Sequence, residues 1–224
     1  MPVTSSAAVV VIRPSYQPGF DGMLLPGTAA AVSSLNLPPL PPVGGETTGR
    51  NVVDLLAEQH RELVELSDRL AAEPDDRRLA DVLIATISRH LSAEEQYLYP
   101  AIRSAVPGGE ELADRELAED HDLLVTLQRL DRGEQAATEV AEAVHRHVAA
   151  DAEELLPVLT QMVSHEDLVR VGNRIETAEE AAPTRPHPGT PSTPPWNKIV
   201  DPAVAVVDKF RDVVTRRTTY SRDL

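Results

Sequence analysis

The sequence contains no cysteine. Disulfides, thiolate zinc sites, cysteine-ligated iron–sulfur clusters and cysteine nucleophiles are therefore excluded. Aromatic residues make up only 3% of the chain, and its apolar residues are mainly Ala, Val and Leu. This composition favours helices over a β-sandwich. HExxH, P-loop and dinucleotide-binding motifs are absent as well.

Basic residues are scarce in the middle of the chain. Residues 51–181 carry 30 acidic and 12 basic residues, a net charge of −18, whereas residues 182–224 have a net charge of +3. An acidic segment argues against nucleic-acid binding and suits cation binding.

Residues 7–12 (AAVVVI) form too short an apolar run for a membrane span and lack a basic leader. We expect a cytoplasmic protein.

Proline marks the borders of the folded part. Residues 1–49 contain eight prolines and are predicted to be a flexible arm, and residues 182–197 contain six and are predicted to be an extended linker. Between them, residues 50–181 show helical periodicity. It predicts helices over about 51–73, 76–105, 110–131, 134–163 and 165–181. We expect an all-α fold in which the first four helices form an up-down antiparallel four-helix bundle and the fifth is an extra helix.

A C-terminal amphipathic helix is predicted in residues 198–224. Asp201 and Pro202 suit its N-cap and first position. One face then carries Val204, Val207, Phe210 and Val214. We expect this face to dock on the bundle; dimerisation and binding to a partner or a membrane surface are alternatives.

A repeat dominates the bundle. HLSAEEQYLYPAI (90–102) matches HVAADAEELLPVL (147–159), which aligns His90 with His147 and Glu94 with Asp151. In each copy the histidine and the acid are four residues apart, on one helical face.

The helices before these segments are also related. EQHRELVELSDR (58–69) matches EDHDLLVTLQRL (119–130), which aligns His60 with His121. The spacing of the apolar residues predicts that all four histidines and both acids face the bundle interior. Unpaired polar groups there would cost several kcal/mol each when charged. A bound metal removes this cost, and imidazole with carboxylate suits a dinuclear centre.

The constellation resembles the haemerythrin-like (HHE cation-binding) family over about residues 51–165. The resemblance implies a non-haem di-iron centre, with two irons per chain held by oxo and carboxylate bridges. It assigns His60, His90, His121 and His147 as terminal ligands and Glu94 and Asp151 as bridges. It also implies dioxygen, peroxide or nitric oxide as the small ligand.

The sequence departs from the oxygen carriers of this family, which have two histidines one turn apart on the third helix. Here Leu117 and Val125 lie one turn either side of His121. Tyr97 and Glu154, each seven residues after a repeat histidine, are candidates for a substitute ligand or for a partner of a ligand. The Glu-x-x-His pair of ferritin-like bundles occurs once, at Glu142 and His145, off the expected buried face.

The sequence therefore leaves three functions open. The leading hypothesis is a protein that binds or senses oxygen, peroxide or nitric oxide. An under-ligated iron favours a catalase- or peroxidase-like enzyme instead. A metal-stabilised interaction module would bind a protein partner through its proline-rich arm or its C-terminal helix.

Overall fold

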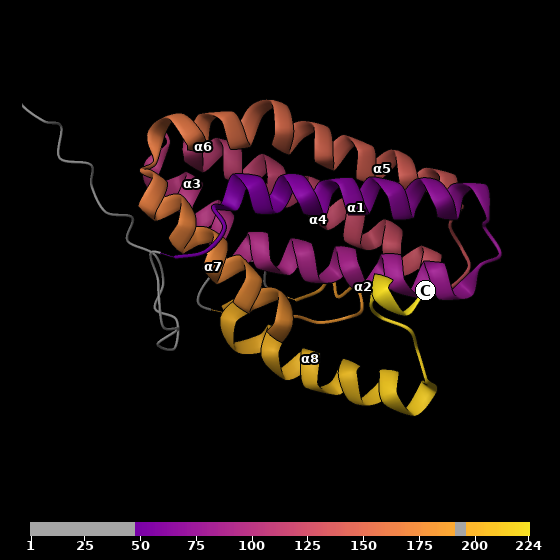
Figure 1. Cartoon of the computed structure of the whole chain (residues 1–224). Helices are drawn as coiled ribbons and strands as arrows, with labels where there is room; N and C mark the ends of the chain where they lie inside the picture. The colour runs from indigo at the N-terminus through magenta and orange to yellow at the C-terminus, as the bar shows by residue number, and fades with distance from the viewer. Residues whose placement is uncertain (1–47, 191–195) are drawn as a thin grey trace, which may run out of the picture. The chain divides into compact units, whose positions relative to one another are not determined.

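The computed structural model describes residues 48–190 and 196–224. Within these residues all regular secondary structure is helical and no strand occurs, which confirms the predicted all-α class. The helices, shown in Figure 1, are α1 (Val52–Ala72), α2 (Arg77–Ala93), η1 (Glu94–Leu98), α3 (Tyr99–Ala105), α4 (Gly109–Asp131), α5 (Ala137–Ala150), η2 (Asp151–Leu155), α6 (Leu156–Met162), α7 (His165–Ala181), α8 (Trp196–Thr215) and η3 (Ser221–Asp223).

Four long helices form the bundle. α1 packs against α2 and α5, and α4 also packs against α2 and α5, so α1 and α4 lie on opposite sides (Figure 1). α2 continues through η1 into α3, and α5 continues through η2 into α6. α7 packs across α1 and α2. The bundle therefore has the predicted helices, and two of them contain a segment of different winding.

Local sequence explains where the helices begin. The side chain of Asn51 accepts a hydrogen bond from the Asp54 amide, and Asp76 and Ser164 cap α2 and α7 in the same way. These side chains satisfy amide groups that the first helical turn leaves without a partner. Before α4, Gly108 adopts a φ of 74°, which a residue with a side chain rarely tolerates.

The apolar core is divided into two clusters. One contains Leu56 and Leu98, and the other contains Leu63, Ile87 and Val144. Along α1 the division falls at position 60, between Leu56 and Leu63. A polar layer thus lies in the middle of the bundle, at the level where the repeat histidines were expected.

The C-terminal helix differs from the prediction. α8 begins at Trp196, so the expected start at Asp201 and Pro202 is wrong. The expected docking face is also wrong, because Val207 is 57% exposed and Val214 is 66% exposed. Ala205, Asp208 and Asp212 are buried instead. Ion pairs, described below, determine this orientation.

The arms are described only in part. Of the predicted N-terminal arm, all but residues 48 and 49 lie outside the described residues. Of the predicted linker, residues 183–190 contain no helix, and Thr184 is buried with only 2% of its surface exposed. In the part of the chain that the structure covers, no helix is both long and apolar enough to cross a membrane.

Candidate metal centre

Five buried side chains meet in the polar layer. His60 comes from α1, His90 from α2 and His147 from α5, while Glu94 and Asp151 are the first residues of η1 and η2. One donor atom from each residue lies within 4.8 Å of all the others. None of the five is more than 3% exposed. The structure therefore brings together five of the six residues that the repeat predicted to be ligands.

The two carboxylates lie between the imidazoles. Glu94 Oε1 is 3.3 Å from His90 Nε2 and 3.9 Å from His60 Nε2, whereas its Oε2 is 3.6 Å from His147 Nε2. Asp151 Oδ2 is 3.4 Å from His60 Nε2 and 3.9 Å from His147 Nε2. The two oxygens of Glu94 thus face different histidines, as a carboxylate shared between two cations requires.

Two of the imidazoles have a polar partner at Nδ1, the ring nitrogen that points away from the centre. His90 Nδ1 lies 2.9 Å from Gln59 Oε1, and His147 Nδ1 lies 3.2 Å from Asp120 Oδ1. Their Nε2 atoms point into the centre and lie 3.2 Å apart. A partner on one ring nitrogen fixes the orientation of the ring and leaves the other nitrogen for a metal.

The two residues that contact these imidazoles have hydrogen-bond partners of their own. Gln59 Nε2 donates a hydrogen bond of 2.9 Å to Glu179 Oε2 on α7, and the Tyr99 hydroxyl donates one of 2.6 Å to Asp120 Oδ2. Tyr99 and Asp120 are each 1% exposed. No spacing to another possible ligand predicted that Gln59, Tyr99 or Glu179 would be part of the site. Asp120 was not predicted either, although it lies four residues after Glu116.

His121 is not part of the centre. It is exposed, and the interior positions of α4 are those of Glu116, Asp120, Leu123 and Leu127. The prediction that His121 faces the interior is wrong because Glu116 and Asp120, rather than His121, occupy the interior face of α4 with these leucines. The pair of acids four residues apart, Glu116 and Asp120, was the signal that could have corrected it.

Glu154 does not lie where its spacing predicted, because it is exposed and pairs with Arg115. Tyr97 is buried, with 3% of its surface exposed, and its role as a substitute ligand or as a partner of a ligand stays a prediction. The spacing is a poor guide here because η1 and η2 are π-helices, which add a residue to the turn and rotate everything that follows. Tyr99 consequently reaches Asp120.

Proline accounts for the wider turns. Pro100 and Pro157 each lie six residues after the site carboxylate, and neither has an amide hydrogen for the carbonyl four residues back. The amide of Tyr99 donates to Glu94 O, five residues back, and that of Leu156 donates to Asp151 O. A proline at this place in an otherwise helical repeat is the sequence signal for the π-turn.

The protonation states follow from burial and neighbouring charges. Burial, then the positive charges of His60 and His147, lowers the pKa of His90 well below its usual value. Burial, followed by the repulsion of Asp151 and Asp120, raises the pKa of Glu94 well above its usual value. Burial alone would lower the pKa of His147, but Asp120 and Asp151 raise it to about 9. Without a cation, the centre therefore retains protons near pH 7.

The donor set fits a metal ion. His60 Nε2, both oxygens of Glu94 and both oxygens of Asp151 are buried without a hydrogen-bond partner. Five such atoms in one layer are costly unless something binds them. Neutral imidazoles and carboxylates are the ligands that iron and zinc accept. A cation would take the place of the protons that Glu94 and His147 hold without it.

Two cavities adjoin the cluster from different sides. One, of about 360 Å³, is lined mainly by apolar side chains of α1, α5, η2 and α6, including Ala57, Val64 and Val148, and it reaches His60. The other, of about 250 Å³, lies between α4 and α5, is lined partly by Glu119, Asp122 and Arg146, and reaches His147. The histidines can therefore be approached through an apolar opening and a charged one.

A buried site of three imidazoles and two carboxylates, inside a four-helix bundle, defines a metal-binding helical protein. The model of the Hemerythrin HHE cation binding domain matches residues 51–170. The chain therefore belongs to the haemerythrin HHE family.

A curated relative agrees with this assignment. An uncharacterised haemerythrin-like protein of Schizosaccharomyces pombe is 23% identical over 176 residues, which cover 74% of this chain and 87% of the relative. No solved structure matches the chain.

Proposed function

We propose that this protein binds two iron ions in the polar layer and that a small oxidant or nitric oxide reacts with it there. The observation that carries the proposal is the cluster of five buried donors whose carboxylate oxygens have no other partner. Iron is typical of the haemerythrin-like family. Iron at this place would supply one-electron chemistry and an open position for a small ligand.

The arrangement suggests a role for each side chain. Glu94 is the best candidate for a bridge, because its two oxygens face different histidines. Asp151 is the second bridge, and His60, His90 and His147 are terminal ligands. Gln59 and Asp120 hold two of these imidazoles in orientation.

Glu116 is our candidate for the donor that replaces an imidazole of α4. It is 1% exposed and lies one turn before Asp120 on the interior face of that helix. Burial, then repulsion by Asp151, raises its pKa to about 7, and its own charge raises the pKa of His147. An oxygen donor here would make the centre richer in carboxylates than the oxygen-carrier pattern.

The ligand that we propose is small and uncharged. The cavity at His60 has apolar walls, which suit dioxygen, nitric oxide or hydrogen peroxide better than a charged substrate. Sensing is the leading function. Decomposition of peroxide is the second candidate, favoured by the missing α4 imidazole. We also propose a cytoplasmic location, with which the lack of cysteine is compatible.

Metal analysis of protein purified without chelators tests the proposal. About two irons per chain and near-ultraviolet bands that change when peroxide is added are expected. Continuous release of oxygen from peroxide would favour the enzyme, and a change that stops after one equivalent would favour the sensor. A single zinc ion, or no metal at all, would refute the proposal.

A further inference from the structure

The outward face of α8 is apolar and positively charged. Val206, Val207, Val213 and Val214 are between 57% and 77% exposed, and Lys209 and Arg211 are exposed at the edges of this face. The Lys209 ammonium donates a hydrogen bond to the Glu180 carbonyl at the end of α7. Among the described side chains of this helix, both carboxylates, Asp208 and Asp212, are turned inward. The helix is thus inverted relative to an ordinary surface helix, which buries its valines and exposes its acids.

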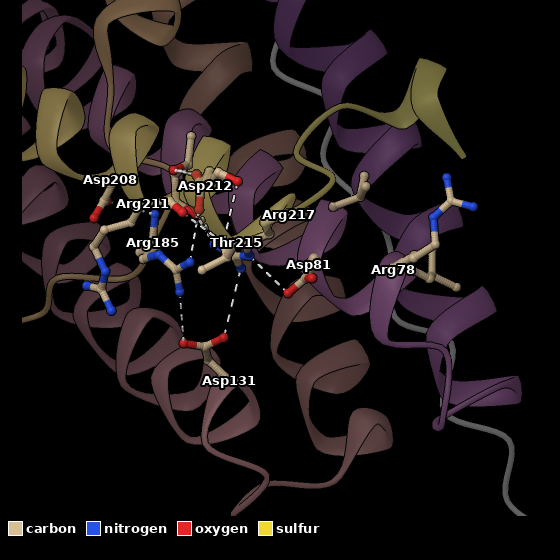
Figure 2. Close-up of polar contacts among 12 residues, drawn as sticks. Arg78, Asp81, Asp131, Arg185, Asp208, Arg211, Asp212, Thr215 and Arg217 are labelled. Atoms are coloured by element: carbon tan, nitrogen blue, oxygen red, sulfur yellow. Dashed lines mark hydrogen bonds and ion pairs between the residues drawn. The ribbon is translucent and has the colours of Figure 1, made fainter.

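Ion pairs on the inner face hold the helix in this orientation (Figure 2). Asp212 accepts a hydrogen bond from the Thr184 hydroxyl and one of 2.9 Å from Arg185 Nη2. Asp208 Oδ2 is 2.9 Å from His187 Nε2 and accepts a hydrogen bond from the Arg185 amide. The carboxylates are therefore engaged with the preceding segment and are not available to neutralise the outer face.

A second set of pairs ties the end of the helix to the bundle. The Arg217 side chain is 4% exposed, and its Nε lies 2.9 Å from Asp81 of α2. Other atoms of the same guanidinium lie 3.9 Å from Asp131 of α4 and 3.7 Å from Asp212 (Figure 2). Because this network includes two bundle helices, the valines are held outward before any partner arrives.

We propose that this outer face of α8 binds the surface of an anionic lipid membrane. Amphipathic helices with an apolar stripe and flanking Lys and Arg lie in the interface of such membranes. Arg216, which is exposed just after the helix, adds a third positive charge. The charges would be attracted to lipid phosphates while the valines enter the boundary of the acyl chains.

Two observations favour a lipid surface over a protein. Among the side chains of α8 that the structure describes, the outer face has no carboxylate to pair with Lys209 or Arg211 of a second copy, so two such faces would repel each other. Four valines with these exposed fractions present roughly 400 Å² of surface, about half of the 800 Å² that each partner of a stable protein complex usually buries. A fluid, negatively charged surface needs neither a large area nor a fixed shape.

The acidic bundle does not prevent this contact. Charges separated by more than about 8 Å are largely screened at physiological salt. A helix is about 10 Å thick, and the carboxylates of α8 lie on its inner side. The lipid phosphates would therefore meet the bases of α8 at short range and the acids of the bundle only through screened interactions.

Vesicle binding by the full-length, metal-loaded protein tests the proposal. Trp196 is the first residue of α8 and the only tryptophan of the chain, so its emission reports on this helix without any mutation. We expect a blue shift and co-sedimentation with vesicles of phosphatidylcholine and phosphatidylglycerol, but not with phosphatidylcholine alone. High salt should reverse the binding.

Variants identify the face. Val206→Asp with Val213→Asp should abolish binding, and Lys209→Gln with Arg211→Gln should weaken it roughly 10- to 30-fold. Circular dichroism and metal content should stay unchanged, since all four side chains are exposed. The matched control is a change of equal charge on exposed bundle arginines, Arg69→Gln with Arg129→Gln, which should bind as the unmodified protein does.

Three outcomes would overturn the proposal. Binding that is equal on both kinds of vesicle would remove the role of charge. Binding that survives the α8 variants would place the contact elsewhere. Absence of binding, combined with a dimer in light scattering that Val206→Asp disrupts, would assign the face to a second copy of the chain.

Discussion

Replacing Glu94 by glutamine should distinguish two opposing contributions to the free energy of unfolding. One is the cost of burying a carboxyl group without a metal, and the other is the stabilisation that a bound metal provides. Glu94 is fully buried, and neither of its oxygens has a hydrogen-bond partner. Burial and the nearby acids raise the pKa of this carboxyl well above its usual value, which favours its neutral form in the metal-free protein. Glutamine has almost the same shape and no charge. The metal-free variant should therefore be no less stable than the unmodified protein, within about 1 kcal/mol.

The metal-loaded protein should respond in the opposite direction. A ligand at 100 times its Kd stabilises the folded state by about 2.7 kcal/mol. In a domain of this size each kcal/mol raises Tm by roughly 2–4 °C, so saturating ferrous iron should raise Tm by roughly 5–11 °C. In Glu94→Gln this increase should disappear, because an amide is a poor substitute for a shared carboxylate.

Differential scanning calorimetry with and without anaerobic ferrous iron measures both effects. His145→Ala is the control, because His145 pairs with Asp68 on the surface at 2.8 Å and both side chains are about half exposed. Such pairs contribute about 0–1 kcal/mol. The control should keep the full increase in Tm with iron. A Glu94→Gln protein that keeps it as well would refute the assignment of the centre.

Four further predictions concern the contacts around the centre and the ion pairs of Arg217. Asp120→Asn and Tyr99→Phe should each lower the affinity for iron roughly 10- to 100-fold, because His147 loses the negative charge beside its Nδ1 or Asp120 loses the hydrogen bond from Tyr99; iron titration checks this. His121→Ala should leave iron content unchanged by metal analysis, since His121 is exposed. Burial raises the pKa of Glu179 to about 7. Between pH 4.5 and pH 7 the folded metal-free protein thus holds a proton that the unfolded chain lacks, and stability falls as pH rises, by up to about 3 kcal/mol. Glu179→Gln should remove the part of this fall that comes from Glu179 and leave the part that comes from Glu116, whose pKa is also raised to about 7; urea unfolding at pH 5 and pH 8 measures the difference. Arg217→Met leaves Asp81, Asp131 and Asp212 without their common partner and should cost about 3–5 kcal/mol in urea unfolding.

Local signals predicted the helices and most of the cluster. The caps at Asn51, Asp76 and Ser164 act within one turn, so they can be recognised without knowledge of the fold. His90 and His147, each followed by an acid four residues later, were found because the spacing occurs twice.

The errors arose where hydrophobic spacing is a poor guide to orientation. On α4 the interior holds two acids, which a rule based on apolar residues assigns to the surface. On α8 the ion pairs of Asp208 and Asp212 outweigh the burial of valines, and no sequence pattern weighs one against the other. The π-turns that begin at Glu94 and Asp151 rotate the following residues about the helix axis. A period of 3.6 residues per turn therefore predicts the wrong face for the residues after them.

The repeat explains the site better once positions are compared in space. In the alignment that pairs His60 with His121, Gln59 pairs with Asp120. Gln59 contacts Nδ1 of His90, and Asp120 contacts Nδ1 of His147. The feature common to the two hairpins is therefore this contact to a histidine of the next helix, and not the histidine that follows Gln59 or Asp120 in the sequence. α1 presents its histidine to the centre in addition, whereas α4 turns His121 to the solvent. The carboxylate of Asp120 raises the basicity of His147, which the amide of Gln59 cannot do for His90. The two halves of the centre therefore differ in charge as well as in the number of imidazoles, and this asymmetry is a physical reason why the small ligand proposed above would prefer one side.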